Sequence, residues 1–273
     1  MRNTNAKGFT LVELLAVILI IAVLIAMLLP ALGAARQSAY MVGCESNLGQ
    51  IGAAAQMYEQ TWRDYVPNQP GLYFKNTVTG VINNVTWDKQ LYDFLSSRRL
   101  PPADMASGGA LPRSLALPVF ICPDDPRLSY FPAAYLSYAI VRGTFGYRLG
   151  GIYVPDNWNN YHPYAVRVDA VPDPSGEIYI TDAYAGGYPF QPGGWPFSFA
   201  GDVGPYQGAA SPPNFLDQQY ATWYNDLVIP PHSGGTFNYL FLDGHVENLH
   251  YAQTIGNGSL LVPKGMWTFA PGD

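Results

Sequence analysis

The stretch that decides the architecture is FTLVELLAVILIIAVLIAMLL, residues 9–29, which contains a single charged residue, Glu13. A helix of this length, at ~1.5 Å per residue, is ~30 Å long, which matches the hydrocarbon core of a bilayer. The preceding residues 1–8 carry Arg2 and Lys7, and basic residues beside a span favour the cytoplasmic side. The sequence therefore predicts a single-pass transmembrane helix at residues 9–29, with a cytoplasmic N-terminus and an exported remainder.

This segment differs in two ways from an ordinary signal peptide. Its apolar region is longer than the usual ~7–15 residues. The segment Ala31-Leu32-Gly33 still offers a loose cleavage site, so a freely secreted protein is an alternative. In addition, Glu13 lies one turn inside the apolar run, where an unpaired carboxylate costs at least ~2.5 kcal/mol and indicates a function by default. The competing explanation is a glutamate that reaches back to the membrane interface.

The segment Lys7-Gly8-Phe9-Thr10-Leu11-Val12-Glu13-Leu14 resembles the prepilin processing motif of type IV pilins and type II secretion pseudopilins. The resemblance implies that a prepilin peptidase cuts between Gly8 and Phe9 and methylates the new amino group of Phe9. Residues 1–8 are then the leader. Glu13 falls at the acidic fifth position of the mature chain, and Pro30 at the helix-bending proline common in the family.

The same resemblance implies how the chain assembles. The amino group of one processed subunit can pair with Glu13 of its neighbour, which neutralises two costly charges and fixes the axial stagger. Loss of one partner would leave a buried charge, at ~3–5 kcal/mol. The implied partners are prepilin peptidase, other pilin or pseudopilin subunits and the inner membrane, from which the subunit passes into a pilus or pseudopilus.

A second apolar pattern follows the span at intervals of three and four residues, as expected for one face of a helix. Its members are Met41, Cys44, Leu48, Ile51, Ala55, Tyr58 and Trp62. Pro67 disfavours helix at the residue before it. We therefore expect one long helix over residues 9–65 and an exported globular head over residues 66–273.

The head has the composition of a loop-rich exported domain. Only 12% of all residues are charged, while Gly, Pro and Tyr number 28, 24 and 20. The net charge is -6 and no basic run follows the leader, which excludes a nucleic-acid footprint. Cys44 and Cys122 form either one disulfide in an oxidising compartment or two buried thiols. The expected fold is α+β, with the long helix packed on an antiparallel sheet with long loops.

Several short segments predict strands. Those ahead of the C-terminal region are residues 119–122, 134–141 and 177–181. The clearest hairpin joins residues 237–242 to residues 245–249 through Asp243-Gly244, a pair suited to a two-residue type I′ turn. Asp243 is therefore expected to be a turn residue.

This hairpin carries a second resemblance. His232-Ser233-Gly234-Gly235 followed by Asp243-Gly244 is similar to a His…Asp-Gly motif of a pilin-like family abundant in Planctomycetes, Verrucomicrobia and Lentisphaerae. Residues 44–52 (CESNLGQIG) and 120–123 (FICP) resemble two further segments of that family. The chain has ten residues between His232 and Asp243 where the family usually has nine, which puts a fixed geometry between the two in doubt.

The candidate metal ligands do not form a recognised pattern. His232, Asp243 and His245 suit zinc, but their spacing does not. Asp124-Asp125 or Asp243 offer oxygens to Ca²⁺, which some pseudopilin heads bind, although no dedicated calcium loop is present. The chain also lacks the hydrolase elbow, the zinc-protease motif and the phosphate-binding loop. We therefore expect no metal, no cofactor and no enzymatic activity.

Besides an ordinary exported enzyme whose N-terminus is merely an anchor, and for which the sequence offers no catalytic residues, two function classes remain. The first is a structural subunit of a type II secretion pseudopilus or type IV pilus-like filament. The second is a surface-anchored or secreted glycan-binding protein, in which aromatic residues such as Trp195 or Trp223 stack on sugars. Aromatic side chains that build the core are the simpler explanation of this composition.

Overall fold

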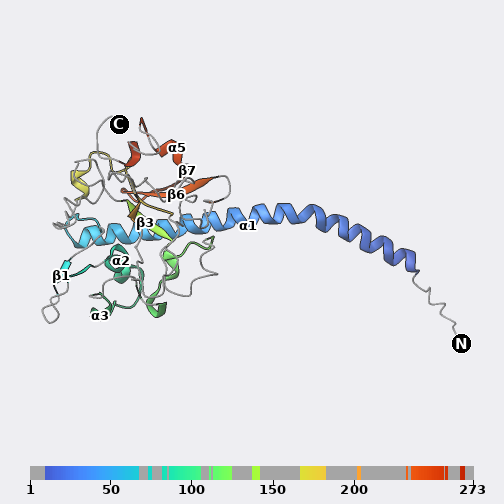
Figure 1. The fold of residues 1–273 in the computed structure, drawn as a ribbon, viewed down its shortest axis with the longest axis horizontal. Coiled ribbons are helices and arrows are strands. Elements are labelled where there is room, and N and C mark those ends of the chain that lie inside the picture. The colour runs from blue at the N-terminus through green and yellow to red at the C-terminus, as the bar shows by residue number, and fades with distance from the viewer. Residues whose placement is uncertain are drawn as a thin grey trace.

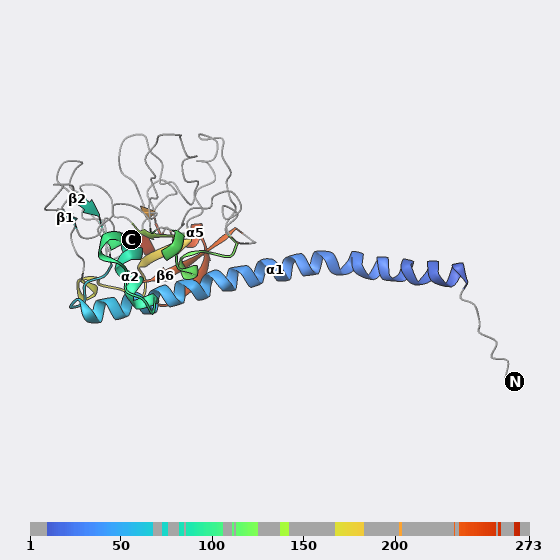
Figure 2. The ribbon, with the colours of Figure 1, turned by 90° about the horizontal axis from the view of Figure 1, so that it is seen from below.

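The computed structural model describes residues 10–67, 73–75, 82–84, 86–105, 111, 113–124, 137–141, 167–182, 202–203, 232, 235–254, 256–257 and 265–267. A long helix extends far beyond a head that is gathered at its C-terminal end (Figure 1). A quarter-turn about the horizontal axis shows the same long stretch of α1 leaving the head (Figure 2). The predicted cleavage site at Gly8 and Phe9, and Trp195 and Trp223, lie outside the described residues.

Helix α1 runs from Leu11 to Thr61 and confirms the prediction of one long N-terminal helix. It begins with a capping box, in which Thr10 Oγ1 accepts from the Glu13 N–H at 3.3 Å and Glu13 Oε2 accepts from the Thr10 N–H at 2.9 Å. Pro30 lies inside the helix without ending it. The helix curves along the part that leaves the head (Figure 1).

The helix ends earlier than predicted, and for a different reason. Arg63 and Asp64 have φ angles of 59° and 66°, a left-handed conformation that terminates helices. The Asp64 N–H donates to the Glu59 carbonyl at 2.9 Å and closes the last turn. The chain therefore reverses before it reaches Pro67.

The remaining helices within the described residues are short. They are α2 (Trp87–Leu95), α3 (Pro102–Met105), α5 (Tyr251–Thr254) and the 3-10 turns η1 (Arg113–Leu115), η2 (Pro118–Phe120), η4 (Val168–Ala170) and η6 (Gly265–Trp267). The predicted strand at residues 119–122 is wrong, because Pro118 opens a helical turn that the Ile121 N–H closes on the Pro118 carbonyl at 3.0 Å.

The head also contains a five-stranded sheet of order β5-β3-β4-β6-β7, which contacts α1 through β6 and β7. Its strands are β3 (Tyr138–Val141), β4 (Ile178–Asp182), β5 (Asp202–Val203), β6 (Thr236–Phe241) and β7 (Val246–His250). All neighbouring pairs are antiparallel except β3 with β5. Strands β1 (Tyr73–Lys75) and β2 (Ile82–Asn84) form a separate antiparallel pair. The fold is thus the predicted α+β arrangement, with a parallel pair at one edge.

The β6–β7 hairpin is confirmed, but its turn is not the predicted type I′. The Gly244 N–H donates to the Phe241 carbonyl at 3.0 Å, and the Phe241 N–H donates to the His245 carbonyl at 2.9 Å. Gly244 has a φ of 94°, whereas Asp243 is not among the residues with positive φ. This is a three-residue loop in which a single glycine takes the left-handed position.

The core lies where α1 packs against the sheet and against α2. In Figure 1 the sheet and α2 lie on opposite sides of α1. Its helix contribution is the predicted stripe from Cys44 to Tyr58, whereas Trp62 is 51% exposed and lies outside it. Gly52 permits the close approach of helix and sheet. A Cβ there would lie 2.7 Å from Leu240 Cδ1.

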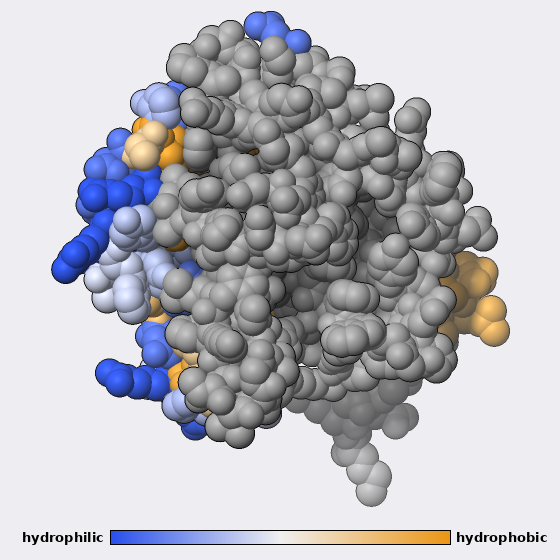
Figure 3. Space-filling view, turned by 60° about the vertical axis from the view of Figure 1, so that its left-hand side comes forward, coloured by the Kyte–Doolittle hydropathy of each residue, from blue (hydrophilic) through white to orange (hydrophobic). Residues whose placement is uncertain are grey.

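The first part of α1, residues 11–40, does not pack against the described part of the head. The large apolar side chains from Leu11 to Leu32 are 46–80% exposed. By length and composition, α1 is long and apolar enough to cross a membrane. In a view toward the head, hydrophilic side chains dominate the described surface on the left, while an apolar group stands out at the right edge (Figure 3).

Candidate functional site at the junction of helix and head

The junction begins at a covalent link. Cys44 on α1 and Cys122 after η2 are joined by a disulfide that bridges 78 residues, with Cα atoms 4.9 Å apart. Both residues are fully buried. Of the two alternatives that the sequence left open, the structure contains the disulfide rather than two thiols.

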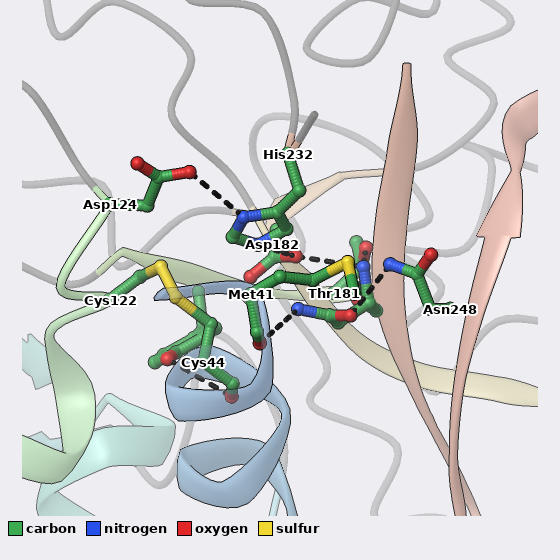
Figure 4. Close-up of polar contacts among 10 residues, drawn as sticks. Met41, Cys44, Cys122, Asp124, Thr181, Asp182, His232 and Asn248 are labelled. Atoms are coloured by element: carbon green, nitrogen blue, oxygen red, sulfur yellow. Dashed lines mark hydrogen bonds and ion pairs between the residues drawn. A yellow bond between two sulfur atoms is a disulfide. The ribbon is translucent and has the colours of Figure 1, made fainter. Parts of the chain in front are cut away.

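A charged cluster lies beside this link (Figure 4). His232 Nδ1 is 3.1 Å from Asp124 Oδ2, and His232 Nε2 is 3.1 Å from Asp182 Oδ2. The side chains of His232 and Asp182 are fully buried, whereas that of Asp124 is 26% exposed. Asp182 Oδ2 also accepts from the Asn238 N–H at 2.7 Å.

The surroundings favour a protonated ring. Burial opposes the charge of His232, but the hydrogen bonds and charges of Asp182 and then Asp124 outweigh it and raise the pKa of the imidazole. Burial raises the pKa of Asp182, against the opposing effects of His232 and the Asn238 N–H. With both ring N–H groups donating to carboxylates, the cluster balances charges that would be costly if unpaired.

Amide and hydroxyl groups extend the cluster to the helix. Asn238 Nδ2 donates to the Met41 carbonyl at 3.4 Å, and Asn248 Nδ2 donates to Asn238 Oδ1 at 2.8 Å. The Tyr138 hydroxyl donates to the Cys44 carbonyl at 3.3 Å. The sheet therefore contacts the backbone of α1 at the first turn that the head covers.

The residues of the His…Asp-Gly motif lie at opposite ends of β6 rather than in one site. His232 forms a bridge with Thr236, where β6 begins, and Asp243-Gly244 lies two residues beyond Phe241, where β6 ends. Six strand residues span ~20 Å. A metal site shared by His232, Asp243 and His245 is therefore excluded by the geometry.

The second end of the motif contacts the helix as well. Gln56 Nε2 donates to the Asp243 carbonyl at 2.7 Å. A Cβ on Gly244 would lie 2.3 Å from that same Nε2, and the φ of 94° is one that residues with a side chain rarely adopt, so the position favours glycine. Because Cys44 and Gln56 are ~18 Å apart along α1, the motif contacts the helix at both ends of the docked segment.

The other predicted site residues have simpler surroundings. Glu13 Oε2 accepts from the Thr10 hydroxyl at 2.8 Å as well as from its N–H. Asp124, considered as a Ca²⁺ ligand, is the partner of His232. Asp125 lies outside the described residues.

Sequence reasoning missed Asp182, which contacts His232, and Asn238, whose N–H fixes Asp182. Each is a fully buried polar residue in a strand made mostly of apolar and aromatic residues, Asp182 in IYITD and Asn238 in TFNYLF. A polar residue at a buried strand position requires a partner, and this was the signal available.

Comparisons with known proteins match the N-terminal segment and a larger part of the chain that follows it. Residues 3–29 match the family described as "Prokaryotic N-terminal methylation motif". Residues 33–214, more than half of the chain, match the family described as "Protein of unknown function (DUF1559)". No solved structure matches the chain.

Two curated relatives match over 68 residues, which is 25% of this chain. The type IV wide pilus major component PilA4 of Thermus thermophilus is 46% identical, and the match spans about half (52%) of that protein. The ComG operon protein 3 homolog of Bacillus licheniformis is 34% identical over 70% of its length. The chain therefore belongs to the DUF1559 family and is a type IV pilin-like protein with a prokaryotic N-terminal methylation motif.

Proposed function

We propose that this protein is a structural subunit of a pilus or pseudopilus-type filament, processed by a prepilin peptidase and assembled through the first part of α1. The observation that carries the proposal is that α1 has an exposed apolar first part and a second part covered by the head. Its large apolar side chains from Leu11 to Leu32 are 46–80% exposed, while the head covers only the later turns. A helix that is apolar all round is covered by lipid or by other helices.

Glu13 supports the same proposal. In this chain its carboxylate completes the cap of its own helix with Thr10. Cleavage after Gly8 would place a new amino group at Phe9, close to the same helix end. Inside a bundle of such helices, the amino group of a neighbour is the cation that offsets the carboxylate charge.

The remaining parts of the proposal follow from this arrangement. The subunit resides in the inner membrane with its N-terminus in the cytoplasm, and then enters a filament with the head outside. A head that is much larger than the helix favours a minor or specialised subunit over a major one. The protein acts by polymerisation, without catalysis and without a bound cofactor.

The direct test is N-terminal sequencing and intact mass of the membrane protein, expressed with and without the host's prepilin peptidase. We expect a chain that begins at N-methylated Phe9 only when the peptidase is present. Gly8→Val should block the cut. Gly33→Val is the matched control, because a Cβ at Gly33 meets nothing within 4 Å.

Two outcomes would contradict the proposal. A chain that begins at Met1 in the presence of the peptidase would be a simple anchored protein. A chain that begins near Gly33 would be secreted in free form.

A further inference from the structure

The disulfide and His232 together place three metal-binding side chains in one buried position. The Sγ atoms of Cys44 and Cys122 and a ring nitrogen of His232 all lie within 4.8 Å of one another. Two thiolates and an imidazole are ligands that zinc and similar divalent ions prefer. In a tetrahedral zinc site, Zn–S and Zn–N bonds of ~2.3 and ~2.1 Å place such ligand atoms ~3.5–3.8 Å apart. The imidazole therefore needs to move by about an ångström, and the two sulfur atoms, once their bond is broken, need to separate from bonding distance to ~3.8 Å.

We propose that reduction of the Cys44–Cys122 disulfide converts the junction into a binding site for a zinc-class divalent ion. An external dithiol supplies two electrons and two protons to the S–S bond, becomes a disulfide itself and leaves two thiols. Binding of the ion then releases both thiol protons and one ring proton of His232 to solvent. The disulfide and the bound ion exclude each other, because the same two sulfur atoms form both.

Asp182 is suited to hold the histidine during this exchange. It is fully buried and fixed by the Asn238 N–H at 2.7 Å. It therefore remains the acceptor for His232 Nε2–H while the other nitrogen takes the ion. A carboxylate behind a metal-binding histidine sets the orientation of the ring in many metal sites.

Asp124 is the partner that gives way. Its side chain is 26% exposed, and it contacts Nδ1, the nitrogen released for the ion. Once displaced, its carboxylate oxygen lies next to the site and can complete four-coordination, or a water can do so. The bound ion thus links α1 to the head in place of the Cys44–Cys122 disulfide.

Cobalt is the probe for this site. The full chain in detergent is reduced under anaerobic conditions with a phosphine, which is then removed before Co²⁺ is added. We expect one Co²⁺ per chain, a thiolate-to-cobalt charge-transfer band, and the visible bands of tetrahedral coordination, all displaced by Zn²⁺. The oxidised chain should show none of them.

Variants separate this site from non-specific binding. Cys122→Ser should lose the charge-transfer band, and Asp182→Asn should weaken Co²⁺ by ~10–100-fold, as for other residues behind a metal ligand. His245→Asn removes an exposed histidine outside the site and should bind like the wild type. Equal loss in His245→Asn, or equal binding by the oxidised chain, would overturn the proposal.

A folding measurement covers the case in which the variants do not fold. Zn²⁺ should raise the melting temperature of the reduced wild type and leave that of the oxidised protein unchanged, because only the reduced form binds the ion. A reduced chain that stays unfolded with Zn²⁺ present would also refute the proposal.

Discussion

The two parts of α1 differ although they belong to one unbroken helix. Residues 11–40 have no fully buried side chain, whereas residues 41–61 contribute Cys44, Leu48, Ile51 and Tyr58 to the core. The free part is apolar on every side as far as residue 35 and carries Glu13 as its only acid. The docked part is apolar on one side only, and this side packs against the core of the head. One helix can therefore suit two environments, an apolar one around its first part and the core of the head around its second. Because the helix is unbroken, the distance between these two environments is fixed.

The largest expected effect concerns the point where the two parts meet. Replacing Cys44 and Cys122 together by Ser should lower the free energy of unfolding of the head by ~4.5 kcal/mol, because the unfolded chain loses a 78-residue closed loop. Urea titration followed by tryptophan fluorescence measures the change. Val42→Ser, at an exposed position of the same helix close to Cys44, is the control and should change stability little. A double variant as stable as Val42→Ser would show that the link contributes nothing.

The next effect tests the free part alone. Glu13→Gln should leave cleavage intact but reduce incorporation into filaments by two orders of magnitude or more, since an unpaired buried charge costs ~3–5 kcal/mol. Quantitative blotting of sheared filaments and membranes measures the ratio. Glu45→Gln removes a carboxylate from the docked part and should assemble normally. Equal assembly of both variants would remove Glu13 from the mechanism.

A glycine pair compares the two parts directly. Gly52→Val should destabilise the head by ~1–3 kcal/mol, because its Cβ would meet Leu240 Cδ1 at 2.7 Å. Gly33→Val, in the free part, should have almost no effect on unfolding. The shift in urea midpoint between the two variants is the measurement. Similar midpoints would mean that the head does not pack on α1 as described.

The smallest effect concerns a second carboxylate of the same helix. Burial, and then the charge of Asp64, raise the pKa of Glu59 to about 7. A raised pKa means that the folded state favours the protonated form, so stability is greatest below pH ~4.5 and falls as pH rises through 7. Glu59→Gln should therefore stabilise the head by ~1 kcal/mol at pH 8, after allowance for partial exposure, and hardly at pH 4.

The matched control for Glu59 is Glu45, another carboxylate on the docked part of α1. Glu45→Gln is measured beside Glu59→Gln by urea titration at pH 4 and at pH 8. A Glu59→Gln variant with the same pH profile as the wild type would contradict the assignment.

The sequence predicted α1 well because its signals are local. The intervals of three and four residues marked the buried face from Cys44 to Tyr58, and the unbroken apolar run marked the free part. The end of the helix was predicted less well. Left-handed conformations at Arg63 and Asp64 and the exposure of Trp62 depend on how the chain turns into the head.

The junction could be predicted only in part. The two cysteines were visible as a pair, but the partners of His232 were not. Asp182 is 50 residues away, and its position depends on the pairing of β4 with β6, whose register shifts between Ile178 and Ile180. Such a shift leaves no pattern in either strand alone, so spacing along the chain could not reveal the cluster.

The position of the disulfide has a mechanical consequence. A tensile force applied along the free part of α1 reaches its first covalent link to the head at Cys44, one turn after the head first contacts the helix at Met41. A covalent bond there transfers stress into the head before the apolar contacts further along are sheared. The apolar contacts between α1 and the head must then break together rather than one after another. The head therefore detaches only if a covalent bond breaks or the helix unwinds.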